Sequence, residues 1–253
     1  MSKGLQDLLI IQKIATGYPF PEAISGTPLC LESNKIHIWT VNYRDLDRGD
    51  KALSALISPD ERQRASQFKE PGDAREYTIR HGYLRLVISR YLCSDPALIP
   101  LITIDQGKPG LDIRPGFPAL SFSLSHTREM VALAVSRYHD IGIDIVKPDA
   151  GYPFSETADY LFTPEENAVI AGTHPDLQYQ TFFRIWALKE ALLKARGGTA
   201  MMMRDTDVSA IIQSPSRDGW YPVRYQQNEQ EFFIHESDIG HGHYCAIATG
   251  MSI

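Results

Sequence analysis

The chain has 253 residues, with 25 Lys and Arg against 31 Asp and Glu, a formal net charge of −6. Hydrophobic residues make up 43% of the sequence and charged residues 22%, which excludes a disordered, collagen-like or coiled-coil protein. The negative charge argues against nucleic acid or an anionic membrane surface as a partner. Three cysteines without a C-x-x-C pair, and no long apolar run, predict a cytoplasmic protein with no membrane span and no export signal.

The first half of the chain is expected to open with a loosely packed arm or a short helix over residues 1–35. Alternating apolar and polar residues predict a strand over 36–42. Ser58-Pro59-Asp60-Glu61 predicts a helix start, because a capping hydroxyl precedes a proline at the first helical position. The pattern that follows predicts a long helix over 73–92 and short strands over 99–104, 121–124 and 131–135.

The second half repeats this order of elements. A strand is predicted over 141–146, and Thr163-Pro164-Glu165-Glu166 repeats the helix-start motif. A long helix over 180–194 and closing strands are then expected, the strands over 208–212, 231–235 and 244–248. The repetition predicts an α+β fold of two duplicated, pseudo-twofold lobes, 1–138 and 139–253, each a small sheet packed on a long helix.

Two acidic residues stand in apolar surroundings. Asp144 lies between isoleucines, where it either occupies an exposed strand face or needs a cation or donor, since a buried carboxylate is costly. At about 100° per residue, Trp186, Glu190 and Lys194 share one stripe of the predicted helix. Glu190 either pairs with Lys194 or joins Asp144 around a hard cation. Two carboxylates from different elements are a typical Mg²⁺ site when the substrate is a phosphate ester.

Chemistry on a phosphate ester also needs cationic side chains. A lysine or arginine on a helix is usually part of a solvated face, and a single histidine is more often structural than functional. The candidates for phosphate contacts are Arg75, Arg80, Lys108, His126 and Lys194.

Taken together, these residues resemble the signature of the 4′-phosphopantetheinyl transferases. Gly142-Ile143-Asp144-Ile145 precedes Trp186-x-x-Lys189-Glu190-Ala191 and Lys194 by about 40 residues. Further matching motifs occur in the family's order: Ser58-Pro59, Gly107-Lys108-Pro109, Phe122-Ser123-Leu124-Ser125-His126 and Thr163-Pro164-Glu165-Glu166. The similarity spans residues 56–200 and is to the monomeric, two-lobed type that activates peptide and polyketide synthetases in secondary metabolism.

The resemblance implies a reaction and a set of roles. The family transfers the 4′-phosphopantetheine arm of coenzyme A to a serine of an acyl or peptidyl carrier protein, needs Mg²⁺ and releases 3′,5′-ADP. Asp144 and Glu190 would hold the metal, Glu190 or a neighbouring water would be the base, and Lys194 would complete the catalytic set. Contacts to coenzyme A are implied for Arg75, Arg80, Lys108, Ser125, His126 and Lys194.

Three positions depart from the family pattern. Val146 stands where many members have a second acid, so we expect water or another polar group to complete the metal site. Glu61 stands where a lysine is common, which leaves Arg62 and Arg64 as contributors to coenzyme A binding, and Gly197-Gly198 replaces a Gly-x-Gly loop.

Val146 motivates a second hypothesis, a catalytically silent module that binds coenzyme A or a carrier. The retention of Asp144 and Glu190 argues against this alternative. Met201-Met202-Met203 could contact a carrier or belong to the core.

Overall fold

The computed structural model describes residues 10–15, 29–46, 49–104, 108–112, 119–137, 140–214, 219–224 and 231–250. Gly107 and the expected lobe boundary at residue 138 lie outside these ranges, as does most of the expected arm over 1–35. Within the described residues, no helix combines the length and apolar character required to cross a bilayer.

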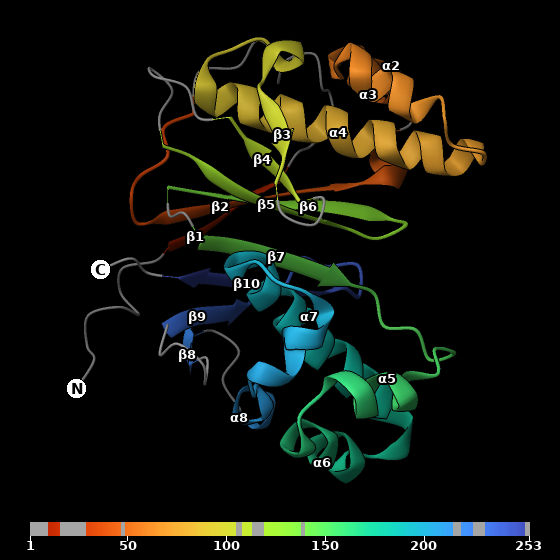
Figure 1. The fold of residues 1–253 in the computed structure, drawn as a ribbon, viewed down its shortest axis with the longest axis vertical. Coiled ribbons are helices and arrows are strands. Elements are labelled where there is room, and N and C mark those ends of the chain that lie inside the picture. The colour runs from red at the N-terminus through yellow and green to blue at the C-terminus, as the bar shows by residue number, and fades with distance from the viewer. Residues whose placement is uncertain are drawn as a thin grey trace.

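The first half of the chain forms a four-stranded sheet beneath a long helix (Figure 1). In spatial order the strands are β1 (Ile10–Ala15), β2 (Lys35–Asn42), β6 (Met130–Ser136) and β5 (Ser121–His126). The helices over it are α2 (Gly49–Leu56), α3 (Pro59–Ala65) and α4 (Pro71–Leu92). A small hairpin joins β3 (Leu101–Thr103) to β4 (Pro109–Leu111), and short 3₁₀ turns occupy Tyr43–Leu46 and Pro96–Leu98.

The second half forms another four-stranded sheet on its own long helix. The strand order is β7 (Asp140–Val146), β10 (Tyr244–Gly250), β9 (Glu231–Glu236) and β8 (Tyr221–Arg224). The helices are α5 (Phe154–Leu161), α6 (Pro164–Gly172), α7 (Gln178–Arg196) and α8 (Ser209–Gln213). Two 3₁₀ turns, η4 (Pro175–Leu177) and η5 (Ala200–Asp205), flank α7.

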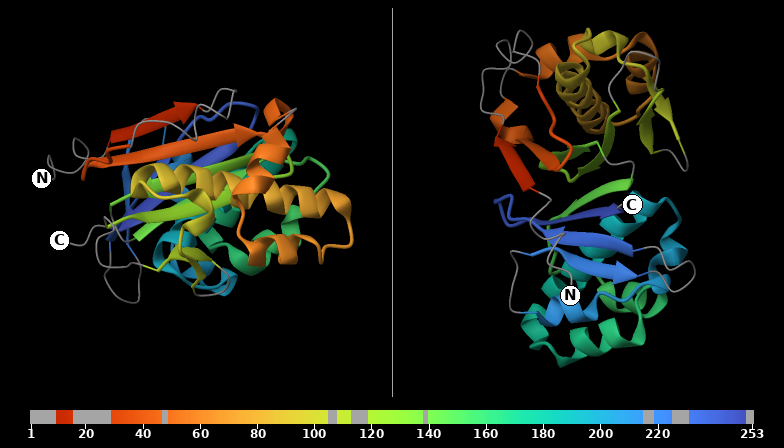
Figure 2. Two further views of the ribbon diagram at one scale, coloured as in Figure 1. Left: turned by 90° about the horizontal axis from the view of Figure 1, so that it is seen from above. Right: turned by 90° about the vertical axis from the view of Figure 1, so that its left-hand side faces the viewer.

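The two halves repeat one topology, which confirms the expected α+β fold. In the first half β6 pairs antiparallel with both β2 and β5, and in the second half β10 pairs antiparallel with both β7 and β9. The fourth strand differs, because β1 extends the first sheet beside β2 and β8 extends the second beside β9. The sheets stack between the two helical layers, as Figures 1 and 2 show. Apolar residues of both sheets fill the space between them, among them Ile38, Ala132, Ile143 and Ile247.

A glycine sets how closely α7 approaches β7. A Cβ atom on Gly142 would lie 2.0 Å from the carbonyl oxygen of Ala191 and 2.5 Å from the amide nitrogen of Ala195, both in the helix backbone. No side chain fits there, so the helix rests directly on the strand. This contact places the last two turns of α7 beside Asp144.

Both helix-start motifs form capping boxes that are tied to the long helices. Glu61, at the third position of α3, accepts a bond from Arg85 Nε of α4 at 2.6 Å. Glu166, at the third position of α6, accepts one from Lys189 Nζ of α7 at 2.7 Å. Each of these two cations also donates to backbone carbonyls beyond its own helix. The same arrangement of a capping glutamate bonded to a buried cation therefore occurs in both halves.

Some sequence predictions were wrong. Residues 208–212 were expected as a strand, but Ser209–Gln213 is a helical turn against α7, because a short apolar run fits either structure. Residues 10–15 are a strand, neither arm nor helix, since they pair in parallel with β2. The strand expected over 99–104 is reduced to Leu101–Thr103.

Candidate active site

Asp144 is the buried centre of the site. Its neighbours Ile143 and Ile145 face the other sheet, so Asp144 points with Gly142 toward α7 and is 6% exposed. Its Oδ1 accepts hydrogen bonds from Ser125 Oγ at 2.7 Å and from Lys194 Nζ at 2.6 Å. The alternative of an exposed strand face is therefore excluded, and the compensating groups come from two other elements.

Glu190 lies one turn before Lys194 on α7 and is close enough to Asp144 for the two charges to interact. Burial raises the pKa of Glu190 and the Asp144 carboxylate raises it further, while Lys194 opposes both. No hydrogen bond or ion pair to the Glu190 carboxylate exists among the residues that the structure describes. The expected Glu190–Lys194 pair is thus replaced by a Lys194–Asp144 pair, and Glu190 remains available as a ligand or base.

Three adjoining cavities surround these residues. One, of about 790 Å³, is lined by Ser125, Asp144, Trp186, Glu190 and Lys194, and extends along residues 126–129 and 145–150. A second, of about 380 Å³, shares Glu190 and Lys194 with it and adds Lys108, Ser123 and Gly197-Gly198. The third, of about 720 Å³, shares His126 with the first and Leu124 with the second. Both acids therefore face a cleft that continues into the first half of the chain.

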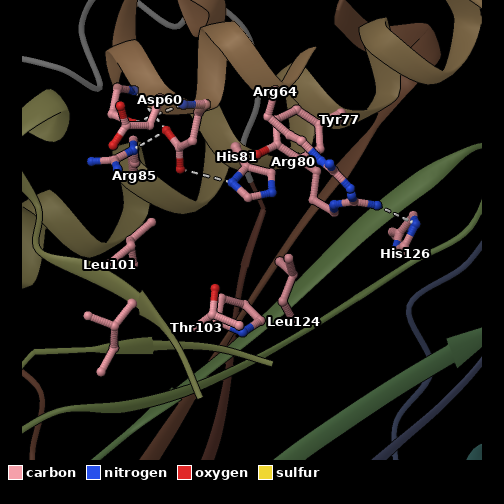
Figure 3. Close-up of a pocket in the computed structure, with 14 residues that line it drawn as sticks. Asp60, Arg64, Tyr77, Arg80, His81, Arg85, Leu101, Thr103, Leu124 and His126 are labelled. Carbon is pink, nitrogen blue, oxygen red and sulfur yellow. Dashed lines mark hydrogen bonds and ion pairs between the residues drawn. The ribbon is translucent and has the colours of Figure 1, made fainter. Parts of the chain in front are cut away.

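The third cavity is rich in nitrogen donors (Figure 3). Arg64, Arg80, His81 and Arg85 line it, and Tyr77 stacks on the His81 ring with centroids 4.0 Å apart. Arg80 reaches across to bond His126 Nε2. Partial burial of the His126 ring, with the charges of Arg80 and Lys194, lowers its pKa to about 4. His126 is therefore neutral near pH 7 and accepts the bond from Arg80.

Glu61, the acid in place of a common lysine, is a structural acceptor in this cavity wall. Burial alone would raise its pKa, but bonds from His81, Arg85 and the Ser58 amide lower the pKa to about 2. These bonds measure 2.9, 2.6 and 2.7 Å. Its negative charge is thereby compensated within the wall, and Arg64 and Arg80 offer positive charge to an anionic ligand in the same cavity. Sequence reasoning missed Tyr77 and His81, whose helical spacing gave no signal beyond core packing.

The remaining expected cations occupy three different environments. Lys108 lines the 380 Å³ cavity and donates to the backbone oxygens of Lys194 and Ile141, which couples the β3–β4 hairpin to the end of α7. Burial and the charge of Lys194 lower the pKa of Lys108. Arg75 is not brought to the cleft, because it lines a separate pocket with Lys51, Ser54 and Thr78. Arg80 and Arg75 are thus separated although they share α4.

The donor set around Asp144 and Glu190 suits a hard divalent cation. Both are carboxylates, which Mg²⁺ prefers, and they line one cavity. No group of three or more acid, histidine or cysteine side chains able to hold a metal occurs in the described part of the chain. Val146 lines the same cavity but offers no oxygen. A cation held here would take two protein carboxylates, and water or substrate oxygens would fill its other positions.

Comparisons with known proteins agree with this geometry. The model of the 4′-phosphopantetheinyl transferase superfamily matches residues 140–248. A 4′-phosphopantetheinyl transferase of Bacillus subtilis is 30% identical over 207 residues, 81% of this chain and 88% of its own length. HetI of a Nostoc species is 29% identical over 189 residues, 75% and 80% of the two chains. Sfp of Bacillus subtilis is 27% identical over 201 residues, 79% and 85%. By this similarity, the chain belongs to the 4′-phosphopantetheinyl transferase superfamily.

Proposed function

We propose that this protein transfers the 4′-phosphopantetheine arm of coenzyme A to a serine of an acyl or peptidyl carrier protein, with Mg²⁺ and with release of 3′,5′-ADP. The observation that carries the proposal is the juxtaposition of Asp144, Glu190 and Lys194 at one end of a cleft whose other end is lined by Arg64, Arg80 and His81. One end suits a cation-bound diphosphate and the other suits a phosphorylated nucleoside.

Asp144 and Glu190 would hold Mg²⁺, which when bound neutralises the charge that grows on the diphosphate. Lys194, Arg80 and His126 would contact phosphate oxygens. Of the remaining expected coenzyme A contacts, Lys108 would reach the ligand from the adjoining cavity. Arg75 lines a separate pocket, so we propose no contact for it.

In the transfer step, the carrier's serine oxygen attacks the phosphorus next to the pantetheine arm. A new P–O bond forms as the bond to 3′,5′-ADP breaks, and the leaving group keeps that electron pair. Glu190, whose pKa is raised by burial and by Asp144, is placed to accept the serine proton directly or through water. Lys194 would hold Asp144 and supply positive charge to the 5′-phosphate of the leaving 3′,5′-ADP.

The protein's context is also proposed. We infer a cytoplasmic monomer of two lobes, 1–138 and 139–253, that does not act on nucleic acid or membranes and serves peptide or polyketide synthetases. The exposed side chain of Met201 remains a candidate for carrier contact, whereas Met203 is buried in the core.

Mass spectrometry of purified apo carrier proteins, incubated with the protein, coenzyme A and Mg²⁺, tests the transfer. The expected result is a gain of one phosphopantetheine by the carrier and appearance of 3′,5′-ADP, with neither product formed by the Asp144→Ala variant. Binding of coenzyme A without any gain across a panel of carriers would instead support the silent binding module.

A further inference from the structure

One contact between the two sheets joins two edge strands, each of which is paired with its own sheet on one side only. β5 and β7 are the edge strands of their sheets and lie next to each other. Outward-facing amides of a buried edge strand need acceptors, because an unpaired buried N–H is costly. Two serines of β5 supply them: Ser123 Oγ accepts from the Ile143 amide at 3.1 Å and Ser125 Oγ from the Ile145 amide at 3.2 Å.

The two serines are similarly buried but differ in the hydrogen bonds that their hydroxyl groups donate. Ser123 is 1% exposed and Ser125 is 4% exposed. Ser125 donates its proton to Oδ1 of Asp144 at 2.7 Å, the oxygen that also accepts from Lys194. A hydroxyl has one proton to donate, so the donor of Ser125 is committed within the protein.

The two donors on Oδ1 leave the other oxygen of Asp144, Oδ2, without a hydrogen-bond donor among the described residues. A carboxylate fixed through one oxygen presents the second in a defined direction, as ligand-orienting contacts do around metal sites. Lys194 alone could not fix it, because a lysine chain is flexible and this one is partly exposed.

We propose that Ser125 is a positioning residue for Asp144, rather than a contact to coenzyme A. Ser125 belongs to β5 in the first half of the chain and Asp144 to β7 in the second. The orientation of the Asp144 carboxylate therefore depends on how the two sheets pack against each other. The catalytic role of Asp144 rests on the proposed function, whereas the hydrogen bond between Ser125 and Asp144 does not depend on it.

Ser125→Ala is the test and Ser123→Ala is its matched control, because each change leaves one amide of β7 without its hydroxyl acceptor. Both variants should lose stability in urea unfolding, and Ser125→Ala should lose more, because it also removes the hydrogen bond to Asp144. Combined with Asp144→Ala, Ser125→Ala should show a coupling of at least about fivefold in the unfolding constant, and Ser123→Ala should be additive. This measurement needs neither substrate nor metal.

Steady-state kinetics supply the second readout. Ser125→Ala should lower kcat roughly tenfold and leave KM for coenzyme A within about threefold. This fall in kcat should exceed that of Ser123→Ala, whose side chain lines the adjoining cavity but does not bond Asp144. The proposal is overturned if the two variants behave alike in both measurements, or if Ser125→Ala raises KM for coenzyme A with unchanged kcat, as expected of a direct ligand. A wild-type protein that transfers nothing would refute the proposed function, and the unfolding cycle would still decide the role of Ser125.

Discussion

Lys189 lies in the motif beside Glu190, yet it is 1% exposed and faces away from every described cavity. Its ammonium donates to the carbonyls of Met203 and Thr206 at 2.7 and 2.8 Å and pairs with Glu166 at 2.7 Å. These partners use all three of its protons. We therefore expect Lys189 to stabilise the fold, by tying α6 and η5 to α7, without touching the substrate.

Lys189→Met measures this contribution. The variant keeps most of the side-chain volume but leaves the Glu166 carboxylate buried with the Thr163 and Val208 amides as its remaining donors. Breaking a buried ion pair typically costs about 3–5 kcal/mol, and the two surviving amide bonds favour the lower end. At about 2–4 °C per kcal/mol for a chain of this size, Tm should fall by roughly 6–12 °C.

Urea and thermal unfolding provide the assay, with Lys147→Met as control. Lys147 pairs with Glu129 at 2.6 Å but is 46% exposed, so its loss should cost at most about 1 kcal/mol. Glu166→Gln combined with Lys189→Met removes both charges, and should be more stable than Lys189→Met alone. The reasoning fails if Lys189→Met is as stable as the control, or if it keeps its stability and loses affinity for coenzyme A.

Three further outcomes are expected. Asp144→Ala and Glu190→Gln should each abolish transfer while the unfolding transition stays cooperative; near-native turnover in either would remove that residue from the site. Arg80→Ala should raise KM for coenzyme A by a factor that corresponds to about 1–3 kcal/mol of lost binding free energy. Arg75→Ala should leave KM unchanged, because Arg75 lines a separate pocket. A similar rise of KM in both variants would contradict this separation. Folding lowers the pKa of Glu61 from 4.5 to about 2, so its ionised form stabilises the folded protein above pH 4.5. This stabilisation is lost as the pH falls toward 2. The free energy of unfolding of Glu61→Gln, measured against pH, should therefore lack up to ~3 kcal/mol of this acid dependence, and an unchanged dependence would contradict the assignment.

The two described halves share a scaffold but differ at the position of one candidate catalytic acid. Arg85 of α4 and Lys189 of α7 occupy matching places, each bonded to the third residue of a capped helix. The residue that follows is Leu86 in α4, buried in the core, and Glu190 in α7, beside the cleft. The scaffold is therefore shared, and the acid of the proposed site at this position occurs only in the second half.

Local features of the fold were determined by the sequence alone. Ser58 and Thr163 begin helices because each hydroxyl accepts the amide three residues later, an interaction complete within one turn. The alternation around Asp144 placed its side chain on the face opposite the isoleucines, and helical periodicity put Glu190 and Lys194 on one stripe. These patterns depend on neighbours in the chain, so they are visible without the fold.

Long-range contacts decided the rest. Arg75 and Arg80 are equally basic and lie on one helix, so only the packing of α4 determines which of them faces the cleft. The partner of Lys194 is Asp144, 50 residues away, and not the adjacent Glu190, because Gly142 lets α7 rest on β7. Residues 208–212 are apolar enough for either structure, and contact with α7 made them helical. Tertiary packing settles such choices because the free energy that separates them comes from burial and pairing between distant segments, which local propensity does not contain.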